Sequence, residues 1–119
     1  MGPRSEQVHL VTGATSGIGR VATLACAATG ASVVFVGRSE DKCKTLLAEI
    51  VAAGNVRCSY LVGDLSVQAD VRAMAAGFLA RHDRLDLLLN NAGAWFTERR
   101  ETVEGFEQTW ALNHLAYFL

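Results

Sequence analysis

Proline is nearly absent from this sequence, since Pro3 is the one proline among 119 residues. The sequence also has no low-complexity stretch, so it offers no candidate linker between domains. Half of the residues are apolar, and a single domain of this size buries roughly two-thirds of the surface of its unfolded chain. We therefore predict one domain over residues 8–119, preceded by a flexible tail at residues 1–7.

Cysteine is also scarce. Cys26, Cys43 and Cys58 are odd in number and too widely spaced for a Cys-x-x-Cys pair. This pattern suits a reducing compartment better than a disulfide scaffold, so we expect a cytoplasmic protein. The three histidines are dispersed along the chain, and no metal site is predicted.

No charge of one sign dominates the chain. Its 11 basic and 12 acidic residues are scattered and give a formal net charge of -1, so we expect neither nucleic acid nor an anionic membrane as a partner. No apolar run approaches the ~20 residues that span a bilayer. The first residues lack the apolar core of a signal peptide, and Glu6 stands where N-myristoylation requires Ser or Thr.

Apolar β-branched runs alternate with helical patterns along the chain. Strands are expected at Val8–Val11, Ser32–Val36, Val56–Val62 and Leu85–Leu89. Helices are expected at Gly17–Thr29 and Val67–Arg81, and another is expected between Ser39, which would cap it, and Gly54, which would end it. After a polar loop at Ala94–Glu101, a last helix is expected from about Thr102 onward. Such alternation with short connections predicts an α/β fold, a parallel sheet with helices on both faces.

The last predicted helix carries an apolar pattern that includes Phe106, Trp110 and Phe118. The sequence stops inside this pattern without a Gly or Asn cap, so we interpret the fold as truncated after about four strands and the following helix. The edge formed by Leu85–Leu89 is then open. An open apolar edge and an unpartnered apolar helix should favour self-association.

A glycine-rich turn, Thr12-Gly13-Ala14-Thr15-Ser16-Gly17-Ile18-Gly19, lies between the first strand and the first helix. The unpaired amides at a helix N-terminus hold a diphosphate, and glycine allows its close approach. An ordinary glycine-containing loop is the structural alternative. The candidate cofactor-binding residues in this turn are Gly13, Thr15, Ser16, Gly17, Ile18 and Gly19.

The spacing of this turn resembles the TGxxxGxG signature of the short-chain dehydrogenase/reductase family, and the resemblance extends over about residues 8–119. It implies a Rossmann-like fold and roles for three further motifs. Asp64, followed by Leu65, matches the acidic residue that holds adenine. Asn90-Asn91-Ala92-Gly93 matches the NNAG motif, which steadies the sheet and lines the adenosine pocket, and Asn113 matches the asparagine of the catalytic tetrad.

Each of these motifs also has a purely structural interpretation. Asp64 could start a helix, Asn90 and Asn91 could form a turn, and Asn113 could be a polar residue on an amphipathic helix. Their order along the chain, each at an expected strand end or helix, favours the resemblance.

The end of the second predicted strand indicates which cofactor is bound. An acidic residue about 20 positions after the glycine turn selects NAD, whereas an arginine there accommodates the 2′-phosphate of NADP. Here Gly37 stands in place of the aspartate that the family uses, and Arg38 follows, with Lys42 one helical turn on. We therefore predict NADP(H), although Arg38 could instead pair with Glu40 or Asp41 at the surface.

The resemblance also implies a catalytic Ser and a Tyr-x-x-x-Lys pair, which this sequence does not contain. Its two tyrosines are Tyr60 and Tyr117, and neither has a lysine four positions later. Without this acid/base, no group supplies the proton that accompanies hydride transfer. We do not expect catalysis by this chain alone.

Two functions of different classes remain. The first is the NADP(H)-binding part of a short-chain oxidoreductase that interconverts alcohols and ketones or aldehydes. The segment from Glu104 to Leu115 is similar to the retinol-dehydrogenase-like branch, which suggests a lipophilic small-molecule substrate. The alternative is a stand-alone, non-catalytic module that binds NADP(H) or a partner. The resemblance also implies a homodimer through the last helix.

Overall fold

The computed structural model describes residues 3–119. Four parallel strands form one sheet in the order β3-β2-β1-β4, and they span Val8–Val11 (β1), Ser32–Gly37 (β2), Cys58–Val62 (β3) and Leu87–Leu89 (β4). The helices are Gly17–Ala28 (α1), Glu40–Ala52 (α2), Gln68–Leu79 (α3), Gln108–Trp110 (α4) and Ala116–Phe118 (α5), with a π-helical turn at Ala111–Leu115 that joins the last two. The predicted α/β fold with a parallel sheet is confirmed.

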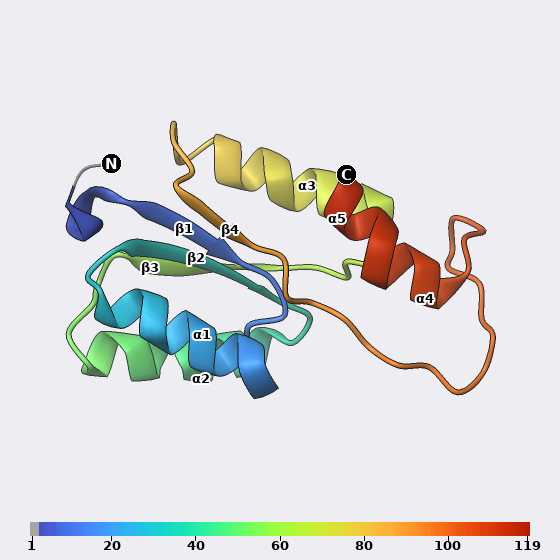
Figure 1. The fold of residues 1–119 in the computed structure, drawn as a ribbon, viewed down its shortest axis with the longest axis horizontal. Coiled ribbons are helices and arrows are strands. Elements are labelled where there is room, and N and C mark those ends of the chain that lie inside the picture. The colour runs from blue at the N-terminus through green and yellow to red at the C-terminus, as the bar shows by residue number, and fades with distance from the viewer. Residues whose placement is uncertain (1–2) are drawn as a thin grey trace.

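Helices cover both faces of the sheet, as Figure 1 shows: α1 and α2 lie on one face, α3 and the last helix on the other. Side chains alternate between the two faces of a strand. Val33 and Phe35 of β2 pack into the larger core cluster, together with Leu46 and Ile50 of α2, whereas Val34 packs against Phe78 of α3. The larger core therefore lies beneath α1 and α2.

Local signals explain where α2 begins. Ser39 caps the helix, because its Oγ accepts a hydrogen bond from the Lys42 amide at 3.3 Å. Glu40 and Asp41 then occupy the first turn, where negative charge is favoured by the helix dipole. The predicted cap is confirmed.

The last helix begins at Gln108, so the prediction of a helix from about Thr102 was wrong. Gly105 has a φ of +85°, a conformation that glycine adopts without strain. It allows a tight turn in which the Thr102 amide donates to the Phe106 carbonyl at 2.7 Å. Glu107 then caps the helix by accepting hydrogen bonds from the amides of Thr109 and Trp110.

β3, α3 and β4 are also shorter than predicted. β3 begins at Cys58 instead of Val56, and α3 covers residues 68–79 instead of 67–81. β4 begins at Leu87 instead of Leu85. Just before it, the Val8 amide donates to the Asp86 carboxylate at 2.8 Å, and the Asp86 amide donates to the Val8 carbonyl at 2.9 Å.

Part of the segment predicted as a flexible tail forms regular structure. Met1 and Gly2 lie outside the described residues. Arg4–Glu6 form a 3-10 turn, and Gln7 is buried, with its carbonyl accepting a hydrogen bond from the Ser32 amide at 3.0 Å. Described structure therefore starts before β1.

Within residues 3–119, no helix is long and apolar enough to cross a membrane. The same part of the chain brings no three metal-ligating side chains together. Its three cysteines, Cys26, Cys43 and Cys58, are free thiols.

Candidate dinucleotide-binding site

A cavity of about 550 Å³ lies at the carboxyl ends of the parallel strands. In open α/β sheets this edge is where ligands bind. The lining comes from the turns after β1, β2, β3 and β4 and from the last helix: Gly13, Thr15, Ser16, Gly17, Ile18, Gly19, Val36, Gly37, Arg38, Ser39, Lys42, Gly63, Leu65, Asn91, Ala92, Gly93, Ala94 and Leu112. Segments that are distant in sequence thus form one site.

The glycines of the turn after β1 are required for different reasons. Gly17 has a φ of +54°, which L side chains rarely adopt. A Cβ on Gly19 would lie 2.0 Å from the carbonyl oxygen of Gly13, and a Cβ on Gly13 would lie 2.7 Å from the Cα of Ala92. The turn therefore packs backbone against backbone, which only glycine permits.

The N-terminus of α1 opens this turn toward an anion. Its N-cap residue, Ser16, makes no side-chain hydrogen bond to the helix, and the first turn contains no acidic residue. The leading amides of a helix carry partial positive charge and have no partner within the helix. Here they stand at the cavity with their donors uncapped by Ser16, an arrangement that suits a phosphate group.

The end of β2 supplies positive charge and leaves no room for a carboxylate. A Cβ on Gly37 would lie 2.7 Å from the Cys43 Sγ and 2.8 Å from the Thr15 Cγ2. Arg38 and Lys42 both line the cavity. Within the described part of the chain neither forms an ion pair, and no lining residue is acidic. The surface pairing of Arg38 with Glu40 or Asp41 is therefore not observed.

A hydrogen-bond network joins the end of β4 to the glycine turn. The Asn91 Nδ2 donates to the carbonyl oxygens of Thr12 and Gly13 at 3.2 and 3.1 Å. The Thr12 Oγ1 accepts from the amides of Asn91 and Ala92, both at 3.1 Å. Thr12 holds the two turns in register, although it was not among the predicted site residues.

The last helix is attached to the same turn. In its π-helical segment, the Asn113 Nδ2 donates to the Ala94 carbonyl at 2.8 Å, and the Asn113 Oδ1 accepts from the Ala94 amide at 3.0 Å. One turn later, the Tyr117 hydroxyl donates to the Ala92 carbonyl, and burial raises the pKa of Tyr117. Both side chains hold residues 92–94 in place. π-helical turns often mark functional positions in helices.

The structure brings most of the predicted site residues together at the cavity: Gly13, Thr15, Ser16, Gly17, Ile18, Gly19, Arg38, Leu65, Asn91, Ala92 and Gly93. Asp64, Asn90 and Asn113 are not in the lining. The Asp64 Oδ1 accepts hydrogen bonds from the amide and hydroxyl of Ser66, at 2.9 and 2.7 Å, and so closes a local turn before α3, whose N-cap residue is Val67. Asn90 is exposed, and the Asn113 side chain is hydrogen-bonded to the backbone of Ala94.

The cavity also contains residues that were not among the predicted site residues: Val36, Gly37, Ser39, Lys42, Gly63, Ala94 and Leu112. Most of them neighbour a predicted residue along the chain. Leu112 could not be found in this way, because its place depends on how the last helix packs. Lys42 had been noted from the sequence as an added positive charge one helical turn after Arg38.

A parallel sheet with a glycine turn and a cavity at the ends of its strands defines a Rossmann-like α/β protein. Residues 7–119 match the family described as short chain dehydrogenase, and the chain belongs to this family. The resemblance noted from the sequence motifs is therefore confirmed.

Curated relatives extend well beyond this chain. Polyprenol dehydrogenase of Mus musculus is 40% identical over 118 residues, which are 98% of this chain and 35% of that protein. Retinol dehydrogenase 11 of Homo sapiens is 38% identical over 114 residues, which are 95% of this chain and 36% of that protein. The chain thus spans about a third of the length of these relatives.

Among solved structures, a metagenomic short-chain oxidoreductase in complex with NADP is 36% identical, with a TM-score of 0.80 over 94% of this chain and 52% of that one. Further similar structures are also described as complexes with NADP or NADPH. The fold of this chain corresponds to about half of such a protein.

Proposed function

We propose that this chain is the NADP(H)-binding part of a short-chain oxidoreductase that interconverts alcohols and ketones or aldehydes. The observation that carries the proposal is the charge arrangement of the cavity: an uncapped helix N-terminus at one point of its lining, and Arg38 and Lys42 without carboxylate partners at another. The NADP and NADPH complexes among the similar solved structures support the same cofactor.

Each group of residues then has a role. The amides of the glycine turn hold the diphosphate, and Arg38 forms charge-assisted hydrogen bonds with the 2′-phosphate, assisted by Lys42. Leu65 bounds the adenine side, and Asp64 precedes it in the turn after β3. Asn91, Ala92 and Gly93 form the opposite wall, and Asn90 precedes them at the strand end. The bound cofactor supplies or accepts the hydride.

Asn113 corresponds to the asparagine of the family's catalytic tetrad. In this chain its side-chain amide is engaged by both backbone groups of Ala94. We propose that this contact fixes the backbone beside the reacting end of the cofactor. Neither tyrosine has a free hydroxyl to donate a proton to a substrate. The Tyr117 hydroxyl donates to the Ala92 carbonyl, and the Tyr60 hydroxyl donates to the Glu40 Oε1 at 2.7 Å.

The second candidate is a stand-alone, non-catalytic module that binds NADP(H) or a partner. The two candidates differ in what the source gene encodes after Leu119 and not in cofactor binding. An open reading frame that continues to a Tyr-x-x-x-Lys motif would exclude the second candidate. In either case we propose a cytoplasmic setting, supported by the three free thiols.

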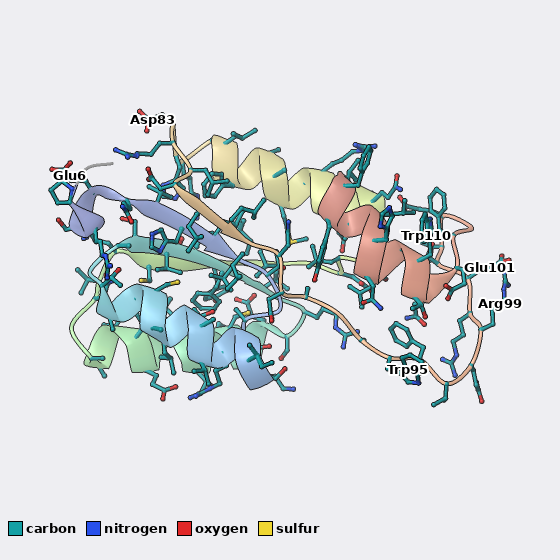
Figure 2. The ribbon with its side chains drawn as sticks, in the orientation of Figure 1. Glu6, Asp83, Trp95, Arg99, Glu101 and Trp110 are labelled. Atoms are coloured by element: carbon teal, nitrogen blue, oxygen red, sulfur yellow. The ribbon has the colours of Figure 1, made fainter. Side chains whose placement is uncertain are left out.

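We also propose that two copies associate through the last helix. Trp110 is 51% exposed and Phe118 is 86% exposed, so the last helix leaves two large apolar side chains uncovered. Figure 2 shows Trp110 at the same end of the molecule as Trp95 of the preceding loop, far from Glu6 and Asp83. Sedimentation of Phe118→Ser beside the unchanged chain tests this: the substitution should shift the equilibrium toward monomer.

Titration calorimetry with NADPH and NADH tests the cofactor assignment. Arg38→Ala should weaken NADPH binding by about tenfold or more, as expected for a lost charge-assisted hydrogen bond, and should leave NADH binding nearly unchanged. Arg81→Ala, an exposed arginine beyond α3, is the matched control and should have no effect on either. Equal loss of NADPH and NADH affinity in Arg38→Ala would contradict the assignment.

A further inference from the structure

Glu104 makes a contact far from its own part of the chain. Its Oε1 accepts a hydrogen bond from the Gln68 amide at 2.6 Å, and its Oε2 accepts one from the Ala69 amide at 3.1 Å. These amides belong to the first turn of α3, whose own N-cap residue, Val67, has no acceptor in its side chain. A carboxylate at this position satisfies two unpaired donors and complements the helix dipole.

The first turns of α3 also support one wall of the cavity. The Asp64 amide donates to the Asp70 Oδ2 at 2.8 Å, which joins the turn after β3 to α3. A Cβ on Gly63 would lie 2.8 Å from the Met74 Cε, so this glycine packs directly on the helix. Because Gly63 and Leu65 line the cavity, the position of α3 determines the position of this wall.

Glu104 belongs to a turn that leads directly into the opposite wall. The turn is closed by a bridge between Glu101 and Glu107 and by a hydrogen bond from the Gln108 amide to the Arg100 carbonyl at 2.8 Å. The last helix follows at once and carries Leu112, which lines the cavity. Figure 1 shows that this helix lies at the same end of the molecule as the start of α3.

We propose that Glu104 is a positioning residue for the cofactor site. Its carboxylate ties the wall formed by Gly63 and Leu65 to the helix that carries Leu112, and so fixes the separation of the two walls between which the cofactor is held. This inference rests on the proposed NADP(H) site. A simple helix cap would change the stability of the protein and leave the affinity of the folded chain unchanged.

Calorimetric titration with NADPH tests the proposal in variants confirmed as folded by circular dichroism. Glu104→Ala should bind NADPH about fivefold more weakly, because loss of the cap frees the first turn of α3 and with it the wall formed by Gly63 and Leu65. Glu104→Gln keeps one oxygen acceptor and should restore most of the affinity. Glu98→Ala is the matched control, since Glu98 lies on the same loop and, within residues 3–119, pairs only with Arg100.

Amide hydrogen exchange of the same variants gives an independent measurement. Exchange at residues 63–69 should be about tenfold faster in Glu104→Ala than in the unchanged chain, and unaltered in Glu98→Ala. Unchanged NADPH affinity in a folded Glu104→Ala, or an equal loss in Glu98→Ala, would overturn the proposal. If the unchanged chain binds no NADPH, the proposed function fails. In that case hydrogen exchange alone tests the role of Glu104. Faster exchange at Gly63 and Leu65 in Glu104→Ala would support the proposal that Glu104 positions this wall, and unaltered exchange would overturn it.

Discussion

The side chain of Asn91 spans the gap between two turns of the site, because its Nδ2 donates at once to the Thr12 carbonyl at 3.2 Å and to the Gly13 carbonyl at 3.1 Å. Neither carbonyl is part of a helix, so the amide of Asn91 replaces a backbone partner for both. The conformation of the glycine turn therefore depends on a residue that lies about 80 positions further along the chain.

Asn91→Ala should destabilise the chain by about 1–3 kcal/mol, the usual result of leaving buried acceptors without a partner. NADPH binding should also weaken, because the glycine turn loses its support. Asn90→Ala is the control: Asn90 is exposed and outside the cavity lining, and its loss should have little effect. Urea unfolding of the two variants makes the comparison, and equal midpoints would contradict it.

Gly19 in α1 and Gly77 in α3 should respond in opposite ways to alanine. In Gly19→Ala the new Cβ would lie 2.0 Å from the Gly13 carbonyl oxygen, a backbone atom that cannot move aside cheaply. We expect a loss of about 2 kcal/mol or more, and of NADPH binding with it. In Gly77→Ala the nearest atom is the Leu61 Cδ2 at an ordinary 3.5 Å.

Gly77→Ala should therefore raise stability by up to about 1 kcal/mol, since alanine is the better helix former. Thermal unfolding followed by circular dichroism measures both changes. A Gly19→Ala variant as stable as the unchanged chain would show that the glycine turn is not packed as described.

The order of strands and helices follows from the sequence because each signal acts locally. Ser39 caps α2 through an amide three residues away, and the β-branched run of β2 is apolar on both sides, as a central parallel strand requires. The glycine turn was also predictable, since glycine spacing and its place between a strand and a helix are both visible in the sequence.

The errors and omissions come from contacts between distant residues. The last helix starts late because Gly105 allows a turn that a bridge from Glu101 to Glu107 closes, and no helix propensity reveals this. Leu112 reaches the cavity through tertiary packing alone. In both cases the contact that determines the outcome forms only in the folded chain.

Leu88 is the residue to change at the open edge of the sheet. β4 pairs with β1 on one side and, within residues 3–119, with no strand on the other. Leu87 and Leu88 are 38% and 48% exposed, and an exposed apolar edge promotes association between chains. Leu88→Lys should lower self-association without loss of fold. Light scattering against concentration measures it, and unchanged scattering would mean that association uses another surface.

His9 should make the stability of the chain depend on pH below about 6.5. The side chain is buried in β1, where its Nε2 is 3.0 Å from the Gln7 Oε1 and its Nδ1 has no hydrogen-bond partner among the described residues. Burial lowers the pKa of His9, which nearby Asp86 raises and Arg4 lowers further. On acidification the unfolded chain therefore takes up this proton before the folded chain does.

Linkage then gives the sign of the effect: stability should fall as the pH drops below about 6.5, and level off once folded His9 is also protonated. Asp86 acts in a separate window, because the hydrogen bond from Arg84 and the one from the Val8 amide lower its pKa, so its contribution is lost only at pH values below 3.8. Urea unfolding at several pH values between 5 and 7.5 measures the slope. His9→Leu should remove it, and a slope that persists in His9→Leu would assign the proton uptake to another group.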